Sequence, residues 1–200
     1  MKNPVLLIIA GPNGAGKTTV TVRLKKEKWS EDVEYLNPDD VAQERFGDWN
    51  SEEAVRSAAT WTTARREELL AHRQGLGFET VFSAPDKIDF LARARAAGYF
   101  VRMLRINAGR VAGRFMSGGH SVPIEKIVNR YTRSMINLGD AIRLANRVYI
   151  YDNSVDDRDA ELCARTQDGL LRKVYAPLPP WVADATESLP RHLEFADLRA

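Results

Sequence analysis

The chain has 200 residues, of which 44% are hydrophobic and 28% charged, and its formal net charge is +2. These values suit one α/β domain over residues 1–200, and so small a net charge gives no reason to expect a nucleic-acid or membrane partner. The single cysteine, Cys163, excludes an internal disulfide and favours a reducing compartment. No apolar run approaches the ~18 residues that span a bilayer, and the first one is too short for a secretory signal. We therefore expect a cytoplasmic protein.

An apolar run, Val5–Ala10, leads into a glycine-rich loop that a helix-compatible segment, 19–28, follows. The loop fits the phosphate-loop pattern G-x-x-x-x-G-K-[ST], in which backbone N–H groups and a helix N-terminus bind phosphates. Lys17 is expected to contact the β- and γ-phosphates as a catalytic residue, and the Thr18 hydroxyl to ligate Mg²⁺. The residues expected to bind the ATP cofactor here are Gly11, Pro12, Asn13, Gly14, Ala15, Gly16, Lys17, Thr18 and Thr19.

Strand-like and helix-like segments alternate along the rest of the chain, which predicts a mainly parallel sheet covered on both faces. Asn50 and Glu53 fit a capping box at the start of a helix, and the stretch 75–77 looks like the break that ends it. We expect a P-loop NTPase fold with a five- to six-stranded sheet, a helical arginine lid at about 108–138 and a C-terminal appendage at about 177–200. Strands are predicted at Val5–Ala10, Val33–Leu36, 78–82, 100–106, 148–151 and, at the edge, 170–175.

Two aspartates, Asp39 and Asp40, follow the second predicted strand. Because ligands of open α/β sheets bind at the carboxyl ends of strands, these carboxylates are expected near the phosphate loop. Phosphoryl transfer needs a group that takes the proton of the acceptor hydroxyl, and Asp39 is the first choice for that base. Asp40 is the second choice and a candidate substrate contact. The alternative is that these residues form a turn and cap the next helix.

Glu79 and Thr80 pair a carboxylate with a hydroxyl near the end of the third predicted strand. Such a pair suits hydrogen bonds to a sugar or ribose, and Glu79 can instead reach Mg²⁺ through water. Ser83 is a weaker substrate-binding candidate whose alternative role is to cap the next helix.

The lid is expected from arginines that bracket a Gly-Gly-His segment. Arginine forks bind phosphoryl oxygens in pairs, and a lid that closes excludes water from the reaction. Arg114 and Arg130 are the candidate catalytic arginines, with Arg133 and His120 as substrate contacts. Asn153, which follows the fifth predicted strand, is expected near the adenine; its alternative is an ordinary Asx turn with Asp152.

Together these motifs resemble the zeta-toxin family of P-loop kinases, in particular its compact chromosomal branch. The resemblance covers about residues 4–154 and is most specific at Gly-Gly-His-x-Val-Pro, residues 118–123, followed by Arg-Tyr-x-Arg-Ser, residues 130–134. It implies an ATP- and Mg²⁺-dependent kinase, with UDP-N-acetylglucosamine as acceptor and a small helical antitoxin as partner. It also implies that Asp39 is the base and that Glu79 contacts the UDP-sugar.

Two other readings stay open from the sequence. The first is a kinase for another acceptor, such as a nucleotide, an antibiotic or a polynucleotide end, although the near-neutral charge argues against nucleic acid. The second is a nucleotide-dependent switch whose role is to bind a partner.

Overall fold

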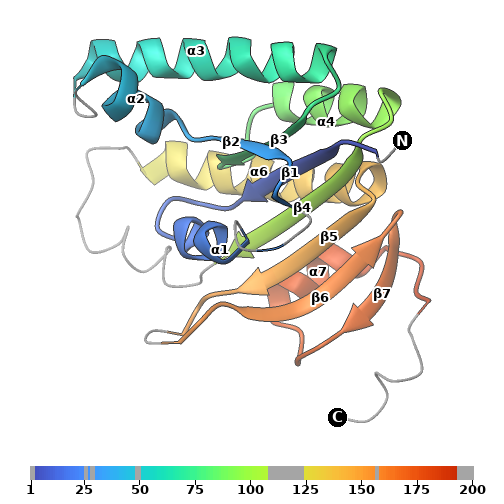
Figure 1. Cartoon of the computed structure of the whole chain (residues 1–200). Coiled ribbons are helices and arrows are strands. Elements are labelled where there is room, and N and C mark those ends of the chain that lie inside the picture. The colour runs from blue at the N-terminus through green and yellow to red at the C-terminus, as the bar shows by residue number, and fades with distance from the viewer. Residues whose placement is uncertain are drawn as a thin grey trace.

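The computed structural model describes residues 3–24, 27, 30–47, 51–107, 124–155 and 158–192. Within them lies a seven-stranded sheet of order β2-β3-β1-β4-β5-β6-β7 (Figure 1). The strands are β1 (Val5–Ala10), β2 (Val33–Leu36), β3 (Gly75–Thr80), β4 (Phe100–Asn107), β5 (Arg147–Asp152), β6 (Glu161–Gln167) and β7 (Leu170–Val174). The helices are α1 (Lys17–Leu24), α2 (Pro38–Phe46), α3 (Glu52–Ala71), α4 (Asp86–Ala96), α6 (Ile124–Leu144) and α7 (Pro180–Thr186).

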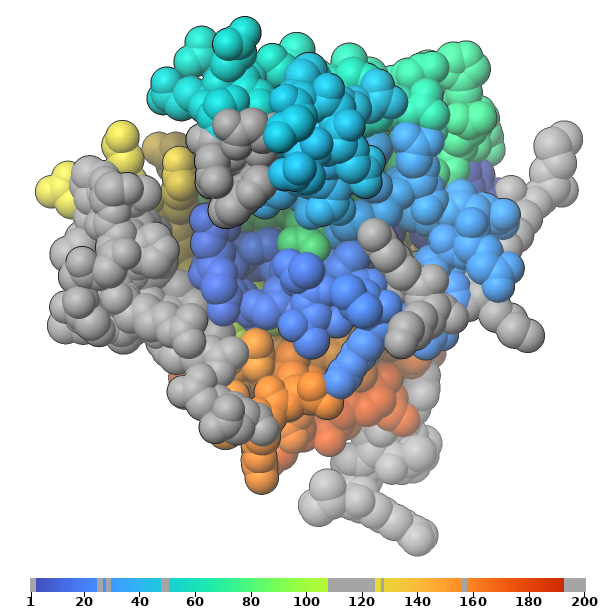
Figure 2. All heavy atoms as spheres, turned by 60° about the vertical axis from the view of Figure 1, so that its left-hand side comes forward, coloured from blue at the N-terminus to red at the C-terminus, as the bar shows by residue number. Residues whose placement is uncertain are grey.

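The strands β2, β3, β1, β4 and β5 run parallel, so their carboxyl ends form one edge of the sheet. In this register Glu79 lies beside Ile9, and Arg105 lies beside Ala10, the last residue before the phosphate loop. This edge faces the viewer in Figure 2, where the N-terminal segment in blue lies between α2 and α3 above and the C-terminal strands in orange below.

Side chains alternate between two hydrophobic layers, as the pleat of a strand requires. Leu6 and Ile8 belong to the larger layer, which contains residues of α3, α4, α6 and α7. Leu7 and Ile9 belong to the smaller layer under α1. Helices therefore cover both faces of the sheet, as expected. None of the described helices has the length and apolar character that crossing a membrane requires.

The sheet has more strands than the five to six predicted, because β6 was missed. Its sequence is polar and carries no apolar run, since it lies near the antiparallel end of the sheet. The turn that follows it held the usable signal. Asp168 and Gly169 have φ of 48° and 80°, the positive values that a two-residue Asp-Gly hairpin requires.

Two local predictions between α2 and β3 were wrong. The stretch 75–77 is the start of β3 rather than a break before it. A Cβ on Gly75 would lie 2.2 Å from the Asp32 carbonyl oxygen, so glycine lets β3 approach the start of β2. The N-cap of α3 is Ser51, whose hydroxyl accepts from Ala54 N at 3.1 Å; Asn50 lies outside the described residues.

The segment expected as a C-terminal appendage carries α7 and takes part in the larger core layer. Val182 and Leu189 are buried there, and Leu171 N donates to the Pro190 carbonyl oxygen at 3.0 Å. The Trp181 indole N–H also donates to Asp152 Oδ1 at 2.9 Å, which connects α7 to the end of β5.

Candidate active site

The phosphate loop, residues 11–18, runs from β1 into the first turn of α1, and its conformation depends on glycine and on a contact from β5. Gly16 has φ of +86°, which L side chains rarely adopt, and a Cβ there would lie 2.5 Å from Asn153 Nδ2. The same Asn153 amide is buried and donates to the Ala15 carbonyl oxygen at 2.9 Å. The hydrogen bond from Asn153, which follows β5, therefore holds the phosphate loop in this conformation.

Lys17 is the first residue of α1, and its ammonium group donates to the Pro12 carbonyl oxygen at 3.1 Å. Burial is the main cause that lowers the pKa of Lys17, and the charge of Arg105 acts in the same direction. The carboxylates of Glu79 and Asp39 oppose this shift and raise the pKa. Lys17 therefore lies within electrostatic reach of residues from the ends of β2, β3 and β4.

Glu79 points to the side of the sheet that α1 covers. Its Oε1 accepts from the Thr21 hydroxyl of α1 at 2.7 Å, and that hydroxyl lies 3.2 Å from the Tyr35 phenol. Burial and the Glu79 charge both raise the pKa of Tyr35, so the phenol stays neutral beside the carboxylate. This position, on the α1 side of the sheet, suits a carboxylate that faces a metal ion or a phosphate.

Asp39 and Asp40 are both exposed in the first turn of α2. The capping alternative is wrong for them, because Asn37 is the N-cap and its Oδ1 accepts from Asp39 N at 3.1 Å. The charge of the Asp39 carboxylate raises the pKa of Lys17 in the phosphate loop. Asp40 influences Tyr35 instead.

The segment after β3 is strained. Phe82 is fully buried with φ of 63°, an unfavourable region for an aromatic residue, and such strain gathers at functional sites. Thr80 Oγ1 accepts from Phe82 N at 2.9 Å, so this hydroxyl supports the bend. Ser83 is half-buried and does not cap α4, whose N-cap Pro85 forms no side-chain bond.

Three polar contacts attach α6 to the carboxyl edge. Arg105 donates to the Ser134 hydroxyl, Asn107 Nδ2 donates to the Tyr131 phenol at 3.1 Å, and Asn137 Nδ2 donates to the Phe82 carbonyl oxygen at 3.0 Å. Of the expected lid residues, Arg130 and Arg133 are exposed on this helix. The expected Arg114 and His120 lie outside the described residues.

Arg105 is the residue of this edge that the sequence reasoning missed. Strand alternation in β4 assigns its position to the core, and it is indeed fully buried. Burial lowers the pKa of its guanidinium to about 10, so the group is still charged at neutral pH. An arginine at a core position of a predicted strand was the available signal.

Asp152 and Asn153 end β5 in two different roles. Asp152 Oδ2 accepts from Ser154 N at 3.3 Å, which is the Asx turn that was the alternative reading, and its Oδ1 accepts from the Ser154 hydroxyl at 2.8 Å. Asn153 instead borders a cavity of about 360 Å³ between α1 and the strand ends. Its lining includes Gly16, Thr19, Arg23, Tyr151 and Asn153.

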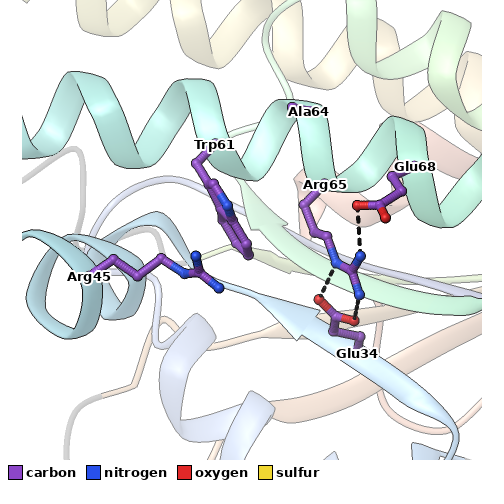
Figure 3. Close-up of a pocket in the computed structure, with 6 residues that line it drawn as sticks. All are labelled: Glu34, Arg45, Trp61, Ala64, Arg65 and Glu68. Carbon is purple, nitrogen blue, oxygen red and sulfur yellow. Dashed lines mark hydrogen bonds and ion pairs between the residues drawn. The ribbon is translucent and has the colours of Figure 1, made fainter.

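A second cavity, of about 410 Å³, lies between α2, α3 and the edge strand β2 (Figure 3). Arg45 stacks over Trp61 with its guanidinium carbon 4.0 Å from the ring centroid. Arg65 binds Glu34 through two nitrogens, at 2.8 and 2.7 Å, and also Glu68 at 2.7 Å. The cavity is lined by two arginines, Arg45 and Arg65, and two glutamates, Glu34 and Glu68, so its charges balance. None of the predicted site residues lines it.

The amino-acid sequence also matches a known protein family. The model of the Zeta toxin family matches residues 1–156. The chain belongs to the Zeta toxin family. It is therefore a member of a family of phosphotransferases with a P-loop kinase fold, and its fold binds nucleotides. No curated protein matches the chain at a significant level.

Solved structures share the fold of this zeta-toxin chain at low sequence identity. One is from the PezAT chromosomal toxin–antitoxin system of Streptococcus pneumoniae, with 18% identity, a TM-score of 0.55, and coverage of 80% of this chain and 71% of the other. Another is the AvrRxo1-ORF1:ORF2 complex with ATP, with 16% identity, a TM-score of 0.57, and coverage of 84% and 59%. The chain thus spans somewhat more than half the length of the AvrRxo1 protein it matches.

Proposed function

We propose that the protein transfers the γ-phosphate of ATP, with Mg²⁺, to a hydroxyl of a nucleotide sugar such as UDP-N-acetylglucosamine. The observation that carries the proposal is that Lys17, Glu79 and Asp39 all lie at the carboxyl edge of the parallel strands, after β1, in β3 and after β2 respectively. A phosphate-binding cation, an acid suited to metal and an exposed candidate base thus share one edge of the sheet. Family membership and the nucleotide-binding fold support the same reaction class.

In this reaction the acceptor oxygen forms a bond to the γ-phosphorus while the bond between that phosphorus and the β,γ-bridging oxygen breaks. Asp39 takes the proton of the acceptor hydroxyl, and ADP leaves. Lys17 neutralises charge on the β- and γ-oxygens, and a cation close to the transferred group stabilises the transition state more than the ground state. Arg114 and Arg130, with Arg133 and His120 as substrate contacts, are proposed to close over the phosphates.

The residues present fit a Mg²⁺ ion held largely by phosphate and water. The described residues contain no cluster of three or more His, Cys, Asp and Glu side chains, which a metal caged by protein alone would need. Mg²⁺ in nucleotide sites instead uses one or two side chains plus phosphate oxygens. Thr18 and, through water, Glu79 would hold the ion, which supplies positive charge to the β- and γ-phosphates.

The cavity of about 360 Å³ beside α1 suits the nucleotide base and ribose. It adjoins Gly16 and Thr19, so a ligand there continues directly from the phosphate loop. Tyr151 offers a ring along its wall, where Arg23 forms an ion pair with Asp159 at 2.6 Å. Asn153 would act mainly through the loop, because its amide is bonded to Ala15.

The test is phosphate transfer from radiolabelled ATP to a panel of nucleotide sugars, nucleotides and oligonucleotide ends. We expect labelled nucleotide sugar with the wild-type chain and none with Asp39→Asn. Label on a nucleotide or oligonucleotide instead would replace the acceptor but keep the reaction class. ATP binding with no transfer to any acceptor would favour the nucleotide-dependent switch.

A small helical antitoxin is proposed as partner. The support is similarity in fold to PezAT, described as a toxin–antitoxin system, and to AvrRxo1-ORF1, which is in complex with ORF2. Co-expression of a helical protein encoded beside this chain, followed by measurement of growth and co-purification, tests it.

A further inference from the structure

We infer that Arg105 is a buried positioning residue that makes the phosphate site selective for ligands with a long, highly charged phosphate chain. The inference deepens the proposed function, on which it rests for the identity of the ATP site. It concerns charge alone, because a fully buried guanidinium cannot touch the ligand.

Among the residues that the structure describes, the guanidinium of Arg105 has only weak, neutral partners. It donates to the Ser134 hydroxyl and, over 3.4 Å, to Met135 Sδ, while its Nε has no hydrogen-bond partner. Burial lowers its pKa and the Tyr131 phenol raises it, and no described carboxylate contributes to the shift. A buried cation of this kind is expensive unless an anion compensates it.

The sequence that follows β4 supplies no such anion. Residues 108–123 contain no Asp or Glu and instead add Arg110 and Arg114. A polyanionic ligand at the adjacent phosphate loop would supply the counter-charge that neither the described neighbours of Arg105 nor the sequence 108–123 provides.

Two observations connect Arg105 to the phosphate loop. Its backbone is in register with Ala10, which directly precedes the loop. The residue after it, Ile106, packs against the first residue of the loop, since a Cβ on Gly11 would lie 2.3 Å from the Ile106 carbonyl oxygen. Because Coulomb interactions weaken slowly with distance in a low-dielectric interior, the field of the Arg105 charge reaches the phosphates bound by Lys17. The attraction grows with each negative charge on the ligand.

Arg66 provides a matched control. Burial also lowers the pKa of its guanidinium, but Asp86 and Glu67 oppose that shift. It lies over the Phe78 ring at 4.8 Å, among α3 and α4 contacts, and does not act on Lys17. Removing this half-buried arginine tests the loss of a partly buried guanidinium without the loss of charge at the phosphate site.

The experiment measures, by calorimetry, the affinities of AMP, ADP, ATP and inorganic tripolyphosphate for the wild type, Arg105→Met, Arg105→Lys and Arg66→Met. We expect Arg105→Met to weaken ATP and tripolyphosphate about tenfold, ADP less and AMP least. Arg105→Lys should restore most of the affinity, and Arg66→Met should leave the series unchanged.

The inference would be overturned if Arg105→Met lowered the affinity equally for all ligands, or if Arg105→Lys restored none of it. Either result would mean that Arg105 only holds α6 in place. If Arg105→Met does not fold, Arg105→Lys and Arg105→Gln carry the same comparison between a retained and a removed charge. A wild type that binds tripolyphosphate in this graded way yet transfers phosphate to no acceptor would refute the proposed function and leave the inference standing. A wild type that binds neither ATP nor tripolyphosphate would overturn both.

Discussion

The Asn153 side chain donates to the Ala15 carbonyl oxygen at 2.9 Å, across 138 positions of sequence. Asn153 N also donates to the Asn107 carbonyl oxygen at 2.7 Å. The residue therefore connects the ends of β4 and β5 to the phosphate loop. The N–H groups of the phosphate loop must point at one ligand. A loop that is already held in this conformation loses less conformational entropy when the ligand binds.

Replacing Asn153 with alanine should therefore weaken nucleotide binding more than it weakens the fold. We expect Asn153→Ala to lose about 1 kcal/mol of unfolding free energy, the usual worth of one hydrogen bond, and about tenfold in ATP affinity. The control is Asn146→Ala, which removes an acceptor for Val101 N at the opposite end of β5. Equal ATP affinity in the two variants by calorimetry would contradict the role assigned to Asn153.

Lys17 should cost the ligand-free protein stability. Its pKa is lowered below 10.5, so its charged form is penalised in the fold at neutral pH, and the penalty fades as the pH rises toward 10.5. We expect Lys17→Met to raise the Tm at pH 7 and to abolish ATP binding. Thermal unfolding at pH 7 and pH 10 checks the sign: the gain should shrink at the higher pH, and a lower Tm at pH 7 would be inconsistent.

Asp39 and Asp40 form a natural pair for testing the base, since both are exposed in the same helical turn. Asp39→Asn should lower kcat about 10²–10⁴-fold, the usual contribution of general base catalysis, without loss of ATP affinity. Asp40→Asn is the control, and its kcat should fall much less. The unfolding free energy of both should stay within about 0.5 kcal/mol of the wild type, because both changes are at the surface. Full transfer by Asp39→Asn would rule out its role as base.

Glu79 can be assigned to metal or to acceptor by kinetics. If it holds Mg²⁺ through water, Glu79→Gln should raise the Mg²⁺ concentration needed for half-maximal rate about tenfold, with little change in the acceptor KM. If it contacts the UDP-sugar, the acceptor KM should rise instead. We expect the first result, because the hydrogen bond from Thr21 places the Glu79 carboxylate beside α1, the helix that also carries Thr18. A change confined to the acceptor KM would return Glu79 to the substrate.

The parallel half of the sheet was predictable because its strands are apolar runs that end in turn-forming or glycine-rich residues. β1 and β2 were predicted with the bounds that the structure has. β6 was not, because a strand near the edge of a sheet needs little apolar sequence, and its polar residues look like a loop. Only the Asp168-Gly169 turn marked it.

At the site, the sequence identified the residue types but not their orientation. Pattern alone cannot say on which side of the sheet Glu79 points, and the Thr21 contact answers that. It likewise cannot separate Asn37 from Asp39 as the helix cap. Arg105 was missed because arginines are mostly exposed, although strand alternation assigns its position to the core, where the structure buries it.

The strand order puts β1 in the interior of the parallel region, with β3 and β2 on one side and β4 and β5 on the other. Asp39 belongs to the first flank and Asn153 to the second. Under the proposed function, the residue that holds the phosphate loop and the candidate base beside the acceptor therefore lie on opposite sides of β1. Substitutions around α2 should then change acceptor specificity while ATP binding is retained, so related proteins with this layout can diversify in their acceptors.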